Sequence, residues 1–375
     1  MAELSPLQRV KYSIAAAEAR LGRSVVSVNP DALPAAQAAL AGGQQPTLVG
    51  VKNTSGIPVE LARRLLTAPG NVWLTRDRMA PGGRAIDTGL VNPLTGRPMT
   101  GSTSGGAVNV LECVTDLAVG TDGGGSVLGP AMTCNLWGVI GTGLGLTGQG
   151  QGRSTDNIMF TSGIGLIARS LSTLARGLDQ LLGRDCWQPL LGAPRAALAG
   201  LKRIVVPAAS SVTRPDGLDM RTLLAPALAA LAFTGAAVVE LDFSGTEVRA
   251  HSLELLRAIL ADPECLILTA EGPVDVYGSG DSVLGSFGGP EAAAQLRSGK
   301  YLLRSANMAG ATAVVVPGGR VSSGFLVTAP PGEEPGRRAL AAAALLADVW
   351  PAPELFHRYF SPDKLLGPGF PQTLD

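Results

Sequence analysis

The sequence predicts an α/β fold built around a large β-sheet. Segments typical of buried strands alternate with amphipathic, helix-like segments along the whole chain, which is the pattern of α/β proteins. Hydrophobic residues make up 46% of the 375 residues and charged residues only 16%, so the chain can bury a large core. No linker rich in proline and serine interrupts it. We therefore expect a single domain over residues 1–375, with a first portion at about 46–185 and a second α/β portion at about 200–350.

Short apolar runs predict the strands, and apolar residues at helical spacing predict the helices. In chain order we expect a helix at 5–22, a strand at 46–56 that runs into a loop, a helix at 59–66, a strand at 71–75, a long loop at 76–106, a helix at 107–114, a strand at 116–121, a helix at 127–137 and a strand at 138–146. The rest of the chain predicts helices at 171–183, 221–233, 250–261 and 335–349, and strands at 203–207, 236–243, 274–277, 312–317 and 324–330. Loops as long as 76–106 are usually functional in a compact chain.

Composition excludes several classes of function. Thirty basic and thirty acidic residues give no net charge and form no basic patch, which argues against a nucleic-acid partner. No signal peptide and no run of 18 apolar residues is visible, so we expect a cytoplasmic protein without a membrane partner. Only two histidines occur and the four cysteines are scattered, so we expect reduced thiols, no metal site and no cofactor.

A glycine-rich centre carries the first chemical signal. Residues 121–126 (TDGGGS) end a predicted strand and precede a predicted helix, so Ser126 stands at a helix N-terminus. Unpaired N–H groups there can hold an oxyanion beside a nucleophilic hydroxyl. The same arrangement suits a phosphate, and a tight turn with an N-cap serine explains it equally well.

Lys52 is the second signal. It ends a predicted buried strand in a chain that contains only five lysines. Burial lowers the pKa of a lysine, so Lys52 could serve as a base near neutral pH. A strand-end lysine that extends to water is the simpler interpretation of this residue alone.

A nucleotide site is the weaker alternative. Residues 143–148 carry a Gly-x-Gly-x-x-Gly pattern after an apolar strand, but the sequence that follows does not predict the helix that a dinucleotide site needs.

Several motifs together resemble those of the amidase signature family. Residues 101–106 (GSTSGG) and 120–126 (GTDGGGS), followed by Pro130 and Cys134, are similar to the family's GGSSGG and G-T-D-x-G-G-S elements. The segment TLVGVKN places Lys52 on the family's catalytic lysine. Further similar stretches follow in the family's order at 162–183, 305–319 and 324–334, so that the resemblance covers roughly residues 10–350.

The resemblance implies a fold and a mechanism. The fold is a large mixed central β-sheet covered by helices on both sides, with its catalytic core at about 46–185. The mechanism is a serine hydrolase in which Lys52 is the base, Ser126 is the nucleophile, and a hydroxyl residue with a cis peptide bond bridges them. Backbone N–H groups of Gly123, Gly124, Gly125 and Ser126 would form the oxyanion hole. A carboxylic amide would acylate Ser126, release ammonia or an amine, and leave the acyl-enzyme to water.

Departures from the family pattern concern the bridging hydroxyl and the substrate. Counting from Gly105 and Gly106 favours Thr103 as the bridge, where the family has serine, and leaves Ser102 and Ser104 as alternative hydroxyls. Leu128 stands where many members have an arginine, so we expect a small, uncharged acyl group.

Two other functions fit the same resemblance. The segment between Lys52 and Thr103 is short, which would fit a catalytically impaired, amidase-like binding protein. Retention of both Lys52 and Ser126 opposes that interpretation. Membership of a glutamine-dependent amidotransferase complex, as one of its subunits, would use the same triad. The expected partner is a small-molecule amide, and a homodimer is left open.

Overall fold

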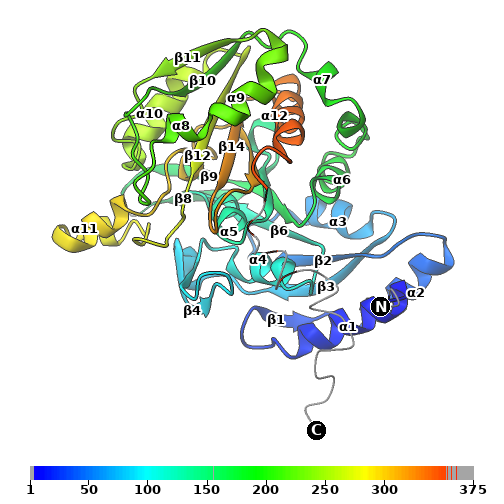
Figure 1. Cartoon of the computed structure of the whole chain (residues 1–375). Coiled ribbons are helices and arrows are strands. Elements are labelled where there is room, and N and C mark those ends of the chain that lie inside the picture. The colour runs from blue at the N-terminus through cyan, green and yellow to red at the C-terminus, as the bar shows by residue number, and fades with distance from the viewer. Residues whose placement is uncertain (1–3, 155, 352, 354–355, 357–359, 361–375) are drawn as a thin grey trace.

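The computed structural model describes residues 4–154, 156–351, 353, 356 and 360. Figure 1 shows an upright, twisted sheet with helices packed against both of its faces. A 12-stranded sheet runs in the order β1-β3-β2-β6-β9-β7-β13-β14-β12-β10-β11, and β8 pairs with β9 outside this path. The strands are β1 (Val25–Val28), β2 (Thr47–Lys52), β3 (Asn71–Asp77), β6 (Leu117–Asp122), β7 (Trp137–Ile140), β8 (Thr147–Arg153), β9 (Met159–Ala168), β10 (Arg203–Pro207), β11 (Ala237–Leu241), β12 (Cys265–Glu271), β13 (Thr312–Pro317) and β14 (Gly324–Ala329).

The sheet is mixed. Strands β3, β2 and β6 run parallel to one another, as do β11, β10 and β12, whereas the strands between these two groups pair antiparallel. Both the first and the second portion of the sequence contribute to this one continuous sheet.

Successive side chains of the central strands point to opposite faces of the sheet, and helices cover both faces. Leu117 of β6 faces the cluster that contains α6 (Leu171–Leu182), whereas its neighbour Ala118 faces the cluster that contains α4 (Ser104–Leu111). Helices α3 (Val59–Thr67) and α12 (Glu333–Leu346) lie on the α6 side, and α5 (Leu128–Thr133) lies on the α4 side. The α/β fold with a mixed sheet covered on both sides is therefore confirmed. The remaining α-helices are α1 (Pro6–Glu18), α2 (Ala32–Ala41), α7 (Pro194–Ala197), α8 (Met220–Leu223), α9 (Ala225–Leu231), α10 (Arg249–Leu260) and α11 (Gly289–Leu296).

Most predicted elements are present within a few residues of their expected bounds. Helix α6 ends at Gly183, which adopts a left-handed conformation with φ at 69°. In the part of the chain that the structure describes, no helix is long and apolar enough to cross a membrane.

Three expectations are wrong, and some strands, β9 among them, were not predicted. The predicted loop 76–106 contains a hairpin of β4 (Ile86–Val91) and β5 (Pro98–Thr100), and α4 begins inside it at Ser104. Strand β9 was missed because its first half mixes Gly, Ser and Thr with apolar residues. The predicted strand at 274–277 is a turn. The strand in this region is β12, just before it, and its residues are all buried, so its sequence has no alternation that would distinguish a strand from a helix. The predicted helix 221–233 is broken, because Pro226 starts a new helix there.

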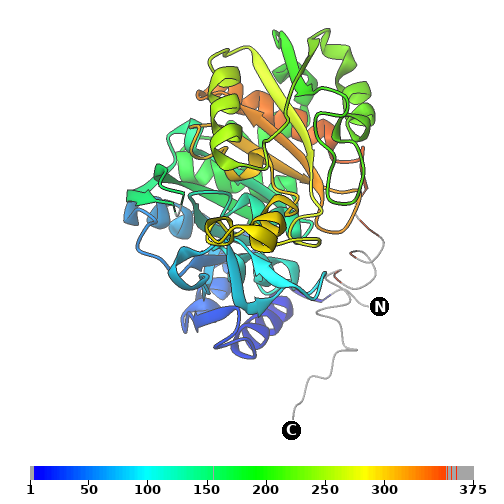
Figure 2. The ribbon, with the colours of Figure 1, turned by 90° about the vertical axis from the view of Figure 1, so that its left-hand side faces the viewer.

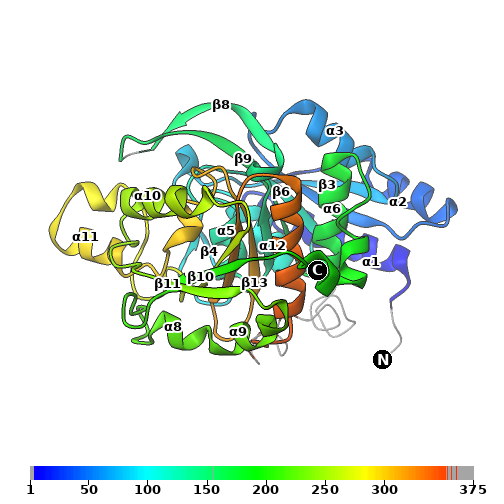
Figure 3. The same ribbon diagram turned by 90° about the horizontal axis from the view of Figure 1, so that it is seen from above.

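Two segments extend beyond the core of the sheet. The segment around α11 projects from the molecule (Figure 1), on the side that carries the β4–β5 hairpin (Figure 2). Thr100 Oγ1 of β5 lies 2.6 Å from Asp275 Oδ2, and Arg84 Nε, just before β4, lies 3.0 Å from Asp281 Oδ2. Strands β8 and β9 form a long hairpin along one side (Figure 3).

Candidate active site

The ends of two neighbouring strands bring Lys52 to the glycine-rich turn. Strands β2 and β6 are parallel, with Val49 opposite Leu117 and Val51 opposite Val119. The carboxyl ends of parallel strands meet at one edge of a sheet, so Lys52 at the end of β2 lies beside Thr121 near the end of β6.

Lys52 is buried and held by hydroxyl and carbonyl oxygens. Its Nζ lies 2.7 Å from Ser102 Oγ, 3.0 Å from the Thr121 carbonyl oxygen and 3.0 Å from Thr121 Oγ1. The side chain is almost wholly removed from water. Burial lowers the pKa of Lys52 from 10.5 to about 7, against the opposing charge of Asp122. A large fraction of this amine is therefore neutral at physiological pH.

The three candidate bridging hydroxyls occupy different environments. Ser102 contacts Lys52 directly. Thr103 packs against β6, since its Oγ1 lies 2.6 Å from the position that a Cβ on Gly120 would take, and this hydroxyl is buried without a hydrogen-bond partner among the described residues. Ser104 donates to Asp87 Oδ2 at 2.8 Å. The hydroxyl beside the lysine is thus that of Ser102, one of the two alternatives to Thr103.

The backbone of this loop also differs from expectation. The peptide bonds of residues 101–106 are trans, and among the described residues the cis bond found is Gly272–Pro273. The turn before Ser102 is made by Gly101, whose φ is 70°. A side chain at Gly101 would lie 2.5 Å from the Pro130 ring and 3.4 Å from the Ser126 Cα atom, so glycine is needed for this close approach.

Ser126 lies against the loop that carries Ser102. Its carbonyl oxygen accepts a hydrogen bond from the Thr103 N–H at 3.1 Å, and Gly101 packs on its Cα atom. Ser102 therefore stands between two residues that both contact Ser126. Ser126 is partly exposed and precedes α5, as the sequence predicts.

Asp122 organises the glycine-rich turn, a role that sequence reasoning left unassigned. Its buried carboxylate accepts N–H groups from Gly125 at 2.7 Å, Val127 at 2.6 Å and Leu128 at 3.3 Å. Burial raises the pKa of Asp122, whereas these three N–H donors and Lys52 favour its charged form. Aspartate is among the residues whose short side chains bond nearby backbone, and its place in the TDGGGS motif is the signal that could have identified it.

This bond changes the expected oxyanion hole. The Gly125 N–H is already committed to Asp122, so it cannot also serve an oxyanion. Gly123, Gly124 and Ser126 are the residues of the turn whose N–H groups have no partner among the described residues.

Asn307 is a second residue that the motifs contained without a role. Its Nδ2 donates to the Gly123 carbonyl at 3.0 Å and to the Thr161 carbonyl at 3.1 Å. It thereby fixes the first glycine of the turn against β9.

A cavity of about 570 Å³ opens beside the lysine. It lies at the end of β2, and its lining contains Lys52 and neighbouring residues of the β2–α3 loop, α3 and β3, but neither Ser102 nor Ser126. The hairpin β8–β9 forms another wall of the site, because Phe160 packs directly over Gly123.

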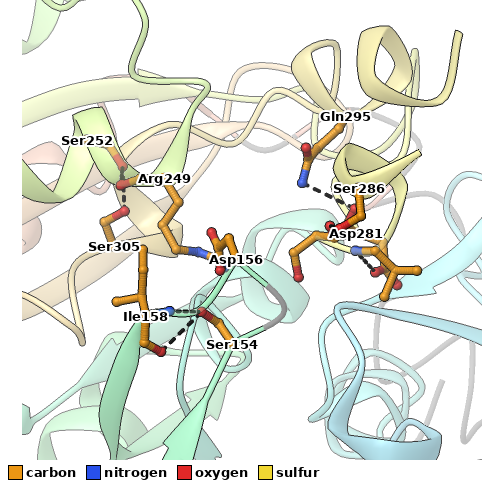
Figure 4. A network of polar contacts seen from close by, with 11 residues as sticks. Ser154, Asp156, Ile158, Arg249, Ser252, Asp281, Ser286, Gln295 and Ser305 are labelled. Carbon is orange, nitrogen blue, oxygen red and sulfur yellow. Dashed lines mark hydrogen bonds and ion pairs between the residues drawn. The ribbon is translucent and has the colours of Figure 1, made fainter. Parts of the chain in front are cut away.

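The polar tip of the β8–β9 hairpin is tied to the second portion of the chain by an ion pair. Asp156 reaches from the tip of the β8–β9 hairpin to Arg249 at the start of α10, with 2.6 Å between Oδ1 and Nη1 (Figure 4). Arg249 is buried and Asp156 is about one-third exposed.

The mixed sheet, with a buried lysine, a serine hydroxyl and a glycine-rich turn at its edge, agrees with the family comparison. The chain belongs to the Amidase family, whose model matches residues 91–309. A glutamyl-tRNA(Gln) amidotransferase subunit from Methanothermobacter thermautotrophicus is 34% identical over 172 residues. This match covers 43% of the present chain, which spans 37% of the length of that relative.

Solved structures share the fold over nearly the whole chain. A protein from a vestigial complex connected with the origins of an s-triazine catabolic enzyme has a TM-score of 0.62 at 18% identity, covering 92% of this chain and 95% of that one. The structure of 6-aminohexanoate cyclic dimer hydrolase with its substrate has a TM-score of 0.61 at 15% identity, and the match covers 95% of this chain and 96% of that one. The peptide amidase of Stenotrophomonas maltophilia has a TM-score of 0.59 at 19% identity, and the match covers 91% of this chain and 93% of that one. At these identities the likeness establishes the fold.

Proposed function

We propose that this protein hydrolyses the C–N bond of a small carboxylic amide through an acyl-enzyme on Ser126. The observation that carries the proposal is the 2.7 Å contact between Ser102 Oγ and the Nζ of a buried lysine whose pKa is lowered to about 7. Membership of the Amidase family supports the reaction class.

The hydrogen bonds of Lys52 fit the role of a base. A neutral amine has two N–H groups and one lone pair. The two oxygens of Thr121 accept the two N–H groups, which leaves the lone pair for the Ser102 hydroxyl. Lys52 then takes the proton of Ser102 while Ser102 takes that of Ser126, and the Ser126 oxygen attacks the carbonyl carbon.

The turn supplies the second half of the mechanism. N–H groups of Gly123, Gly124 and Ser126 stabilise the oxyanion, and Asp122 and Asn307 hold these donors in place. The C–N bond breaks as the proton returns from Lys52 through Ser102 to the leaving nitrogen. Water, activated by the same relay, attacks the acyl-enzyme, releases the carboxylic acid and restores Ser126.

Three alanine variants test this assignment of roles. Ser126→Ala should abolish hydrolysis of small amides, since no acyl-enzyme forms. Ser102→Ala should lower kcat by about 10²-fold or more, the usual size of a general acid–base contribution. Thr103→Ala is the matched control and should change kcat by less than about 10-fold, because its hydroxyl makes no contact with Lys52.

The measurement is ammonia release from a panel of primary amides, with labelling of Ser126 by a fluorophosphonate. Full activity of Ser126→Ala would refute the hydrolase proposal. If Thr103→Ala loses activity while Ser102→Ala keeps the native kcat, the bridging hydroxyl is that of Thr103.

The 34% identical amidotransferase relative supports a second candidate, in which this chain acts as one component of a larger complex. The isolated chain would then hydrolyse no small amide in the panel, although the fluorophosphonate would still label Ser126.

A further inference from the structure

Arg304 is a buried cation that has no ion-pair partner among the described residues. The residue is 3% exposed, and its Nε and Nη2 atoms are sealed from solvent without a hydrogen bond. Among the described residues no carboxylate lies within ion-pair distance of its guanidinium. An arginine keeps its charge at any physiological pH, and burying a charge without a partner is costly. Such a group calls for a ligand that the structure does not contain.

Backbone contacts fix Arg304 on top of the glycine-rich turn. Its Cα atom lies 3.1 Å, and its carbonyl oxygen 3.5 Å, from the positions that Cβ atoms on Gly125 and Gly124 would occupy. The buried carboxylate of Glu271 holds the short turn before it, accepting the N–H groups of Leu302 at 2.8 Å and Leu303 at 3.1 Å. The position of Arg304 is therefore set by the same core that sets the turn.

A second buried arginine approaches the turn from α10. Arg249 Nη2 lies 3.3 Å from the position of a Cβ on Gly124, and its Nε is buried without a partner. Figure 4 shows Arg249 reaching Asp156, while Ser252 of the same helix contacts Ser305, the neighbour of Arg304. The two arginines thus belong to one connected cluster.

Three carboxylates, those of Glu271, Glu247 and Asp156, act on Arg304 from beyond ion-pair distance, and none of them accepts a hydrogen bond from its guanidinium among the described residues. Asp156 compensates Arg249, whereas the Glu271 oxygens are occupied by backbone N–H groups. Burial, followed by the nearby charge of Arg249, lowers the pKa of Arg304 to about 10, which still leaves it protonated at neutral pH. An anion that accepts hydrogen bonds from the buried, unpaired N–H groups of Arg304 and Arg249 would offset the cost of their burial.

We propose that Arg304 and Arg249 bind a carboxylate on the acyl part of the substrate, so that the preferred substrates are monoamides of short dicarboxylic acids. The guanidinium group pairs with carboxylates better than any other side chain, because its planar N–H groups match two oxygens at once. Arg249 adjoins Gly124, whose N–H belongs to the proposed oxyanion hole, so carboxylate and reacting carbonyl are only a few atoms apart. This inference rests on the proposed function and replaces the expectation, drawn from Leu128, of an uncharged acyl group.

Matched substrates test the carboxylate site by kinetics. Malonamate, succinamate and glutaramate are compared with 3-methylbutanamide, 4-methylpentanamide and 5-methylhexanamide, in which an isopropyl group replaces the carboxylate. The native protein should favour the best anionic amide by about 10-fold or more in kcat/KM, as expected for one charge-assisted contact. Arg304→Met should remove this preference mainly through KM, so that its kcat/KM for the anionic amide falls to the value for the matched neutral amide. Arg304→Lys should restore part of it.

Binding separates this inference from the proposed reaction. In Ser126→Ala, calorimetry should detect succinamate binding that is lost with Arg304→Met in the same background. Binding without hydrolysis by the native protein would keep the carboxylate site and refute the hydrolase. Hydrolysis of neutral and anionic amides with equal kcat/KM would refute the carboxylate site alone.

Stability tells a ligand-binding role from a structural one. Arg214 is also buried, but it is paired with Asp216 at 2.9 Å and serves as the control. Arg304→Met should maintain or raise the Tm of the ligand-free protein, whereas Arg214→Met should lower it without changing substrate preference. A lower Tm for Arg304→Met, with equal losses on both kinds of amide, would overturn the proposal.

Discussion

Lys52 illustrates how burial turns a strongly basic amine into a base that works near neutral pH. Desolvation is the main cause of its lowered pKa, and the opposing charge of Asp122 only moderates it. Its hydrogen-bond partners are neutral oxygens of Ser102 and Thr121, which serve the amine in either protonation state. One residue thereby acquires its chemistry from three separate segments of the chain.

The pH dependence follows directly from this pKa. The proposed base is active when neutral, and the neutral form of Lys52 prevails above about pH 7. We expect kcat/KM for a neutral amide to rise with pH, to reach half its maximum near pH 7 and to level off above it. A pH–rate profile between pH 5 and 9 measures this.

Lys52→Arg is the matched variant for the same test. Arginine does not lose its proton in this range, so activity should fall by about 10³-fold or more at every pH. A profile for the native protein that falls between pH 6 and 8, or an active Lys52→Arg variant, would contradict the role of Lys52 as base.

At the scale of the element, the glycine-rich turn depends on Asp122 more than on its glycines alone. Three glycines give the backbone freedom to turn, but the carboxylate chooses the conformation by accepting three N–H groups in succession. The same contact decides which N–H groups remain for an oxyanion. The sequence motif displayed the aspartate, but it could not tell which donors the aspartate would take.

Removing this carboxylate should loosen the turn. Asp122→Ala leaves three buried donors without an acceptor, and we expect the free energy of unfolding to fall by about 3 kcal/mol and kcat/KM by at least about 10-fold. Urea unfolding and amide hydrolysis measure the two effects.

Asp219→Ala is the control, because Asp219 accepts the N–H groups of Ser210 and Thr222 near the surface and away from the turn. It should cost about 1 kcal/mol and leave activity unchanged. Equal effects of the two substitutions on kcat/KM would show that Asp122 has no special relation to the site.

On the scale of the whole molecule, the continuous sheet joins the two portions of the sequence. Strand β7 pairs with β9 on one side and with β13 on the other, and the largest apolar cluster contains residues from both portions. We therefore propose that residues of the two portions unfold together, as a single domain would.

Hydrogen exchange can measure this cooperativity. Amides of β2 and β10 should exchange through one global opening, with the same free energy and the same dependence on denaturant. Amides of α11, which has no buried residues, should exchange faster by local opening and serve as the internal control. Distinct opening free energies for β2 and β10 would indicate two independently unfolding domains.

The sequence by itself determined the α/β class, most of the strands and helices, and the segments that carry the site. The spacing of apolar residues reflects the burial of one face of a helix or strand, so it can be recognised in the sequence without knowing which elements pack against that face. The hairpin β4–β5, strand β9 and the turn at 274–277 were missed, because Gly- and Ser-rich strands and fully buried runs lack such a period.

Only the tertiary structure decided which side chains meet. It placed Ser102 rather than Thr103 beside Lys52, assigned the Gly125 N–H to Asp122, and gathered Arg249 and Arg304 over the turn. These contacts join residues as far apart in the sequence as Gly124 and Arg304, and they depend on the register of neighbouring strands and on backbone turns. Hydrogen bonds act over about 3 Å, whereas sequence spacing fixes a position only to within a residue or two, which along a strand is about 3–7 Å.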